Sequence, residues 1–155
     1  MIQKSMDLGV LGSPNTIFVR KFRWTIEIFN PLNQTRAGDQ KLVDEYCFKH
    51  VDIDFKENKL EMIVMEVITE GSLDIQIQSW LEQKYHDGEY LKFTTYDGTG
   101  RPLYEYIFDG LEVIGEKMSF DYASTEESTR ELSVKFSNYK RNFLFINNDT
   151  YQKTN

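Results

Sequence analysis

Residues 91–139 constrain the fold more than any other part of the chain. Within this run, aromatic residues at positions 104, 106 and 108 alternate with Leu103, Glu105 and Ile107, and this period of two is typical of a β-strand. Glycine-containing turn signals follow at residues 97–100, 109–110 and 115–116, and each predicts a point where the chain folds back. We therefore expect four or five short strands in this run, forming a structural building block and not an active site.

Length and composition favour a single packed domain. The chain has 155 residues, of which 40% are hydrophobic and 14% aromatic, enough to form one core and too many for a disordered chain. We expect an N-terminal arm over residues 1–16, a single β-barrel domain over residues 17–146 and a flexible C-terminal tail over residues 147–155. No stretch reaches the roughly 20 apolar residues that a membrane-spanning helix needs, so we expect no membrane insertion.

The charge balance is acidic, with a formal net charge of −7. A molecule of this charge repels polyanions as a whole, which argues against tight binding of DNA or RNA. Basic residues do alternate with aromatic ones around residues 20–23. That pattern is more simply a half-buried strand with a solvated basic edge than a nucleic-acid site.

Further strands are predicted before residue 91. Residues 17–29 alternate as a central strand, with Phe22, Trp24, Ile26 and Ile28 on one face. Residues 45–55 and 60–68 predict a hairpin around a turn at residues 56–59. Residues 34–44 are polar and indicate an exposed loop, and the spacing of apolar residues favours a short helix over residues 78–85.

Few residues have the pattern of a chemical site. His50, Asp52 and Asp54 alternate on one predicted strand and could in principle bind a metal, but neighbours on one strand converge poorly, so a solvated polar face is favoured. Cys47 is interpreted as a small buried apolar residue. Residues 97–100 lack the pattern of a phosphate-binding loop and indicate a hairpin turn. We expect no enzyme activity, no cofactor and no metal.

Several segments, taken in order, resemble the tail tube proteins of contractile-tailed bacteriophages, a family related to the hemolysin-coregulated tube protein of type VI secretion. The resemblance runs from about residue 18 to residue 145, and its motifs are degenerate and not catalytic. It rests on residues 22–28 (FRWTIEI), 80–81 (WL), 91–100 (LKFTTYDGTG), 106–110 (YIFDG), 118–122 (MSFDY) and 132–136 (LSVKF). The resemblance implies a mainly β fold, a small β-barrel or sandwich with one short helix.

The resemblance also implies an assembly. Homo-hexameric rings would stack into the inner tail tube of a virion, assembled in the host cytoplasm, with sheath and baseplate proteins as partners. DNA would pass through the lumen without tight binding, because an acidic wall repels phosphates. Candidates for stacking are residues 1–16, the loop 34–44 and the tail after residue 143. Candidates for a lumen-facing or inter-subunit surface are Asp52, Asp54, Glu57, Lys59, Glu61 and Glu66.

Three alternatives remain open. Two of them keep the same fold: a specialised ring protein of the tube end or baseplate, and a tube subunit of a phage-like injection or type VI system. A hypothesis of a different class is a monomeric β-sandwich that binds a carbohydrate or peptide through exposed aromatic residues. That surface would consist of Trp80, Tyr85, Tyr90 and Tyr96.

Overall fold

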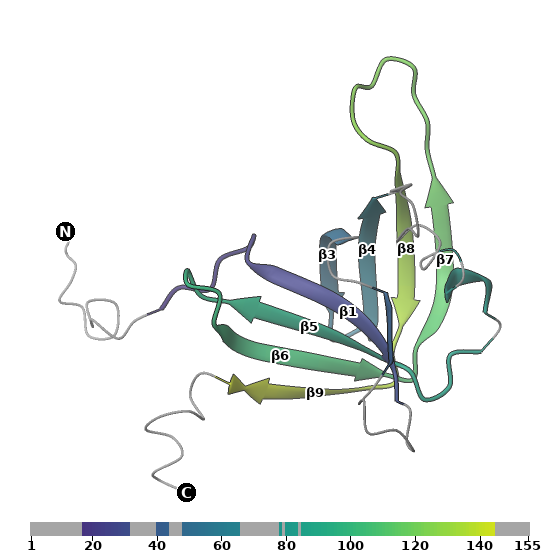
Figure 1. Ribbon diagram of the computed structural model, residues 1–155. Helices are drawn as coiled ribbons and strands as arrows, with labels where there is room; N and C mark the ends of the chain where they lie inside the picture. Colours follow the sequence, from purple (N-terminus) through teal and green to yellow (C-terminus); the bar gives the residue numbers. More distant parts are fainter. Residues whose placement is uncertain are drawn as a thin grey trace, which may run out of the picture.

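The computed structural model describes residues 17–31, 40–43, 48–65, 78, 80–83 and 85–144. In this part of the chain, strands form two antiparallel sheets whose strands run across one another (Figure 1). One sheet has five strands in the order β2-β1-β5-β6-β9, and the other has four in the order β3-β4-β8-β7. The strands are β1 Trp24–Asn30, β2 Gln40–Val43, β3 Phe48–Asp54, β4 Lys59–Met65, β5 Tyr90–Tyr96, β6 Pro102–Asp109, β7 Glu112–Met118, β8 Thr129–Lys135 and β9 Asn138–Phe143.

The core lies between the two sheets and is built by alternation. Every second residue of β4 points inward and is 1% exposed, and the central part of β1 alternates in the same way. The inward residues of β8 are buried as well, Leu132 and Val134 at no more than 2% exposure and Arg130 at 8%. Each fully buried side chain of this size contributes about 1.5–3 kcal/mol to the free energy of unfolding. The most deeply buried apolar residues are Ile26, Ile28, Leu60, Met62, Val64, Trp80, Leu91, Phe108, Leu132 and Val134.

The predicted hairpin over residues 45–68 is confirmed as β3 and β4, which pair antiparallel. Its turn is closed by the Asp54 carboxylate, whose Oδ1 accepts hydrogen bonds from the amides of Lys56 and Glu57, both at 3.0 Å. Asn58 completes the turn with a φ of 53°, a conformation that asparagine tolerates better than most residues. Local turn chemistry therefore fixes the register of this hairpin.

The prediction of several strands in residues 91–139 is also confirmed, because β5 to β9 cover this part of the chain. The expected turn at residues 97–100 is present: the Asp97 carboxylate accepts hydrogen bonds from the amides of Thr99 and Arg101. The turn at Asp109-Gly110 separates β6 from β7 as expected. The turn expected at residues 115–116 is wrong. Gly115 lies within β7 at a shift of register, and the chain reverses only after β7 ends.

The predicted strand at residues 17–29 begins seven residues later than expected, at Trp24. The partner strand β5 ends at Tyr96, whose amide donates to the Arg23 carbonyl at 3.0 Å. Among the described residues, no strand therefore pairs with the chain before Arg23. Residues 17–21 are exposed and Phe22 is 72% exposed, so Phe22 does not share the buried face of Ile26. The interpretation of residues 20–23 as a half-buried strand is therefore wrong.

Two other expectations are corrected or bounded by the structure. The loop expected over residues 34–44 contains β2, which pairs with β1, so its last part is a strand. The short helix expected over residues 78–85 is present at Gln78 and at residues 80–82. Cys47, Glu66, the arm 1–16 and the tail after residue 144 lie outside the described residues. Among the helical residues that are described, none belongs to a helix long and apolar enough to cross a membrane.

Gly110 provides a test of the turn between β6 and β7. Its φ is +66°, and an added Cβ would collide with the side chain of Ser137. Gly100 has a φ of +90° with open space around it, so it serves as a matched control for backbone strain alone. We expect Gly110→Ala to lower the free energy of unfolding by about 1–3 kcal/mol more than Gly100→Ala. Urea denaturation checks this, and equal losses would contradict the collision.

Asp97 makes stability depend on acid pH. The hydrogen bond from the Thr99 hydroxyl, followed by that from the Arg101 amide, lowers the pKa of Asp97 from 3.8 to about 2. A carboxylate whose pKa is lower in the folded protein than in the unfolded chain stabilises the fold at pH values above the unfolded-state pKa. This stabilisation is lost as the pH falls through the folded-state pKa. We expect Asp97→Asn to be less stable than the wild type at pH 7, with a difference that shrinks between about pH 4 and pH 2. A pH-independent difference in urea denaturation would contradict this.

Candidate functional site

The outer surface of the four-stranded sheet collects charged side chains, and we call it the outer charged face. Because β3, β4, β8 and β7 bury alternate residues, the residues between them share the opposite face. Acidic side chains outnumber lysines five to three on it. Its charged members are Asp52, Asp54, Lys59, Glu61, Glu112, Lys117, Glu131 and Lys135.

The structure brings four of the six predicted lumen or interface residues onto this face. Asp52 lies opposite Glu61, and Asp54 lies opposite Lys59. Lys59 Nζ is 3.2 Å from Glu61 Oε2, and this carboxylate also accepts a hydrogen bond from the Ser133 hydroxyl at 3.3 Å. Glu57 lies in the turn at the end of the hairpin and is exposed. Neighbouring strands therefore tie these charges into one polar surface.

The possible metal ligands on β3 do not converge. His50 Nε2 is 3.1 Å from Asp52 Oδ2, whereas the Asp54 carboxylate is engaged with the amides of the turn. Among the described residues, no group of three or more acidic, histidine or cysteine side chains is placed to hold a metal ion. The His50–Asp52 pair is half exposed, which fits a solvated polar face.

The outer charged face has a hollow of about 390 Å³. Gly115 helps to form it, because β7 carries no side chain at the position opposite Ser133. Carboxylates and cationic side chains both line the hollow, which includes His50, Asp52, Glu61, Lys117 and Glu131. Mixed charge in an open hollow suits a hydrated surface better than an enclosed ligand site.

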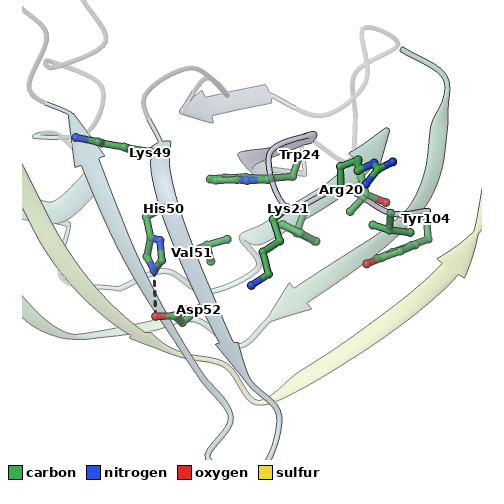
Figure 2. A pocket seen from close by; sticks show the side chains of 11 residues that line it. Arg20, Lys21, Trp24, Lys49, His50, Val51, Asp52 and Tyr104 are labelled. Carbon is green, nitrogen blue, oxygen red and sulfur yellow. Dashed lines mark hydrogen bonds and ion pairs between the residues drawn. The ribbon is translucent and has the colours of Figure 1, made fainter. Parts of the chain in front are cut away.

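A second hollow of about 410 Å³ lies beside β3, and we call it the cationic pocket (Figure 2). Figure 2 shows His50 and Val51 of β3 on one side and Lys21 and Trp24 on the other. Tyr104 also lines the pocket, and burial raises the pKa of its phenol group. The cationic or protonatable side chains that line it are Arg20, Lys21, Lys49 and His50, against one carboxylate, that of Asp52. Such a pocket suits an acidic group carried next to an aromatic ring.

A buried polar cluster was not foreseen from the sequence. Glu89 Oε1 accepts a hydrogen bond from the Trp80 indole at 2.8 Å and lies 2.8 Å from His86 Nδ1. All three residues are at most 7% exposed, and the Trp80 and His86 rings are 4.4 Å apart. The only sequence signal was a histidine and a glutamate three residues apart after a tryptophan, which is too common to be diagnostic.

This cluster corrects the aromatic ligand surface considered above. Trp80 is 1% exposed and belongs to the core, so it does not contact a ligand. Tyr90 stacks on Phe29 with ring centroids 5.2 Å apart, and the Tyr96 hydroxyl is 3.0 Å from the Thr25 hydroxyl. Of the four aromatic residues proposed for that surface, Tyr85 is the one that is largely exposed. The aromatic residues therefore do not form one exposed binding surface.

The Glu89 cluster yields a stability prediction. Glu89→Ala would leave the Trp80 indole N–H and His86 without their buried acceptor, which costs roughly 1–3 kcal/mol of unfolding free energy. Glu89→Gln keeps an acceptor oxygen of the same size and should lose less. Urea denaturation followed by tryptophan fluorescence measures both variants. Equal stability of Glu89→Ala and the wild type would show that the cluster does not support the fold.

Neither a protein-family model nor a curated protein matches the sequence. Solved structures do match the fold. A chain of the cryo-EM structure of the anti-feeding prophage baseplate aligns with a TM-score of 0.56 and 10% identity, over 83% of this chain and 98% of that chain. A chain of the sheath-tube complex of an extracellular contractile injection system, PVC, aligns with a TM-score of 0.53 and 11% identity, over 90% and 100%.

The tube-terminating cap of the anti-feeding prophage also contains a chain of this fold, with a TM-score of 0.53 and 10% identity, over 89% of this chain and 99% of that chain. At such low identity these matches establish the fold. The prediction of a mainly β, tail-tube-like fold is confirmed. This chain has the fold found in the baseplate, sheath-tube complex and tube cap of contractile injection systems.

Proposed function

We propose that this chain is a structural subunit whose copies form a ring, and that stacked rings make the inner tube of a tail-like machine. The observation that carries the proposal is the four-stranded sheet, which is charged on its outer face and ends in two edge strands, β3 and β7. An edge strand presents backbone groups that can pair with another chain. Pairing of β7 in one copy with β3 in the next would use both edges.

The strand directions suit such a ring. Each neighbouring pair in the order β3-β4-β8-β7 is antiparallel, so β3 and β7 themselves run in opposite directions. A rotation about an axis parallel to these strands leaves the direction of every strand unchanged. In such a ring, β7 of one copy therefore meets β3 of the next copy in an antiparallel pair. The same contact repeated from copy to copy is heterologous, and it forms a ring when the rotation between copies closes.

The outer charged face would line the bore of this ring. The predicted residues Asp52, Asp54, Lys59 and Glu61 lie on it, and acidic side chains outnumber lysines. A wall of this sign repels a phosphate backbone and lets it slide, whereas a basic wall would retain it. We propose that DNA passes through the lumen in this way if the machine is a phage tail.

Finer features of the assembly belong to the same proposal. Six copies per ring agree with the six-fold symmetry of the baseplate structure that contains a chain of this fold. The sheath-tube match supports a place inside a sheath, with sheath and baseplate proteins as partners and a location in a virion tail or an injection machine. The matches in a baseplate and in a cap favour a second candidate, a ring at one end of the tube.

Electron microscopy of the purified full chain, with light scattering for its mass, tests the proposal. Stacked rings with a central hole are expected for the repeating tube. Single rings that do not lengthen would favour the tube-end ring. A monodisperse monomer at high concentration would refute both.

The position of the outer charged face can be tested by gold labelling. In a Cys47→Ser background, Glu61→Cys places one thiol on this face, and Lys140→Cys places one on the opposite surface of the five-stranded sheet as a control. We expect gold bound at position 61 inside the central hole and gold bound at position 140 outside it. Gold at position 61 on the outer rim would contradict the assignment of the lumen.

A further inference from the structure

The loop between β7 and β8 projects past the ends of its sheet (Figure 1). Two of its aromatic side chains are exposed. Phe120 is 74% exposed and Tyr122 is fully exposed. Asp121 orders the tip, since its carboxylate accepts a hydrogen bond from the Ala123 amide and its carbonyl accepts one from the Ser124 amide, both at 3.0 Å. We call residues 118–122 the aromatic finger. Ordered, exposed aromatic residues of this kind are typical anchors of protein interfaces.

The cationic pocket is chemically complementary to this finger. The loop 119–128 contains three carboxylates and no basic residue, whereas the segment 17–23 contains three basic residues and no carboxylate. The segment already holds guanidinium groups over aromatic rings, with Arg20 5.8 Å from the Phe18 ring centroid and Arg23 5.0 Å from that of Phe22. The acidic and aromatic side chains of the loop would therefore contact the basic and aromatic side chains of the segment that lines the pocket.

The finger and the pocket of one copy lie at opposite edges of the sheet. The pocket is beside β3 and the finger follows β7, with β4 and β8 between them. Three strand spacings separate these edges by roughly 14 Å, more than a side chain spans. One carboxylate of the loop, that of Glu127, does reach Lys49 within the chain, at 3.8 Å. The aromatic finger, by contrast, follows directly from β7, the edge strand farthest from the pocket.

The register places the base of the finger level with the start of β3. Met118 lies beside Arg130, Arg130 beside Val64, and Val64 beside Phe48. The end of β7 and the start of β3 are therefore at the same end of the sheet. If β7 of one copy lies along β3 of the next with these ends level, the base of the finger at Met118 lies beside Phe48, one residue before Lys49, which lines the pocket.

We propose that the aromatic finger of each copy docks into the cationic pocket of the next copy. Phe120 and Tyr122 pack against Trp24 and the neighbouring apolar wall, and Asp121 faces Arg20 and Lys21. This inference rests on the proposed ring and specifies the contact that locks one subunit to another within it. The contact is head to tail, so every copy gives one finger and receives one.

Disulfide trapping tests the contact directly. Two full-length chains, both with Cys47→Ser, are co-expressed, one carrying Tyr122→Cys and the other Lys21→Cys. Mild oxidation is expected to link the two different chains. As a control, Lys140→Cys replaces Lys21→Cys, because it faces the other side of the five-stranded sheet and should not link. Electron microscopy of the same samples records whether rings form.

The possible outcomes separate this contact from the ring itself. A specific link in ring-forming samples supports the docking. Rings without the link would overturn the docking and leave the ring proposal intact, whereas unlinked monomers would overturn both. As an independent measure, Tyr122→Ala should raise the concentration at half assembly by about tenfold or more with unchanged circular dichroism, as for an aromatic anchor, while Tyr122→Phe should change it less. An unchanged Tyr122→Ala value would contradict the docking.

Discussion

The apolar layer between the two sheets determines the rest of the structure. Alternate residues of β1 and β4, such as Ile26, Ile28, Leu60 and Met62, fill this layer and are at most 1% exposed. Because side chains alternate along a strand, burying one set of residues forces the other set onto the outer surface. The same choice of register that hides Met62 therefore exposes Glu61 and the charged residues beside it.

A sheet held in this way still has edges, and the proposed function depends on them. The core anchors the four-stranded sheet through β4 and β8, which leaves β3 and β7 at the rim. Natural proteins usually protect such edges, but a subunit that assembles can use them. The two edge strands, the outer charged face and the aromatic finger all belong to the four-stranded sheet. Pairing of this sheet between copies would therefore bring the same features of neighbouring copies into line. The proposed ring would act through the repeated contacts between its copies and through its central bore.

Much of the fold could be predicted from the sequence, because alternation and turn chemistry are local signals. The hairpin of β3 and β4 and the turn at Asp97 were foreseen for this reason. Failures occurred where a distant neighbour decides the outcome. Residues 17–23 alternate like a strand, but no strand that the structure describes lies beside them, and the residues of β2 appear polar but pair with β1. Gly115 signals a turn by itself, yet β8 holds it within β7 as an irregularity.

The candidate site was less predictable than the fold. The strand period places Asp52 and Asp54 on one face of their strand, but it is the hairpin register that adds Lys59 and Glu61 to that face. The cationic pocket is harder still to foresee, because it brings segment 19–21 next to β3, which lies far away in the sequence. Trp80 illustrates the same limit, because its burial depends on Glu89 accepting its indole N–H. Aromatic residues in a sequence do not reveal whether they face a ligand or the core.

Hydrogen exchange at the sheet edges tests the central claim most directly. The full chain would be compared in its assembled and dissociated states, with amide exchange measured for each strand. The account predicts that amides of β3 and β7 exchange more slowly after assembly, while those of β4 and β8, already paired on both sides, change little. Equal exchange of β3 and β7 in both states, or slowing confined to β2 and β9, would contradict it.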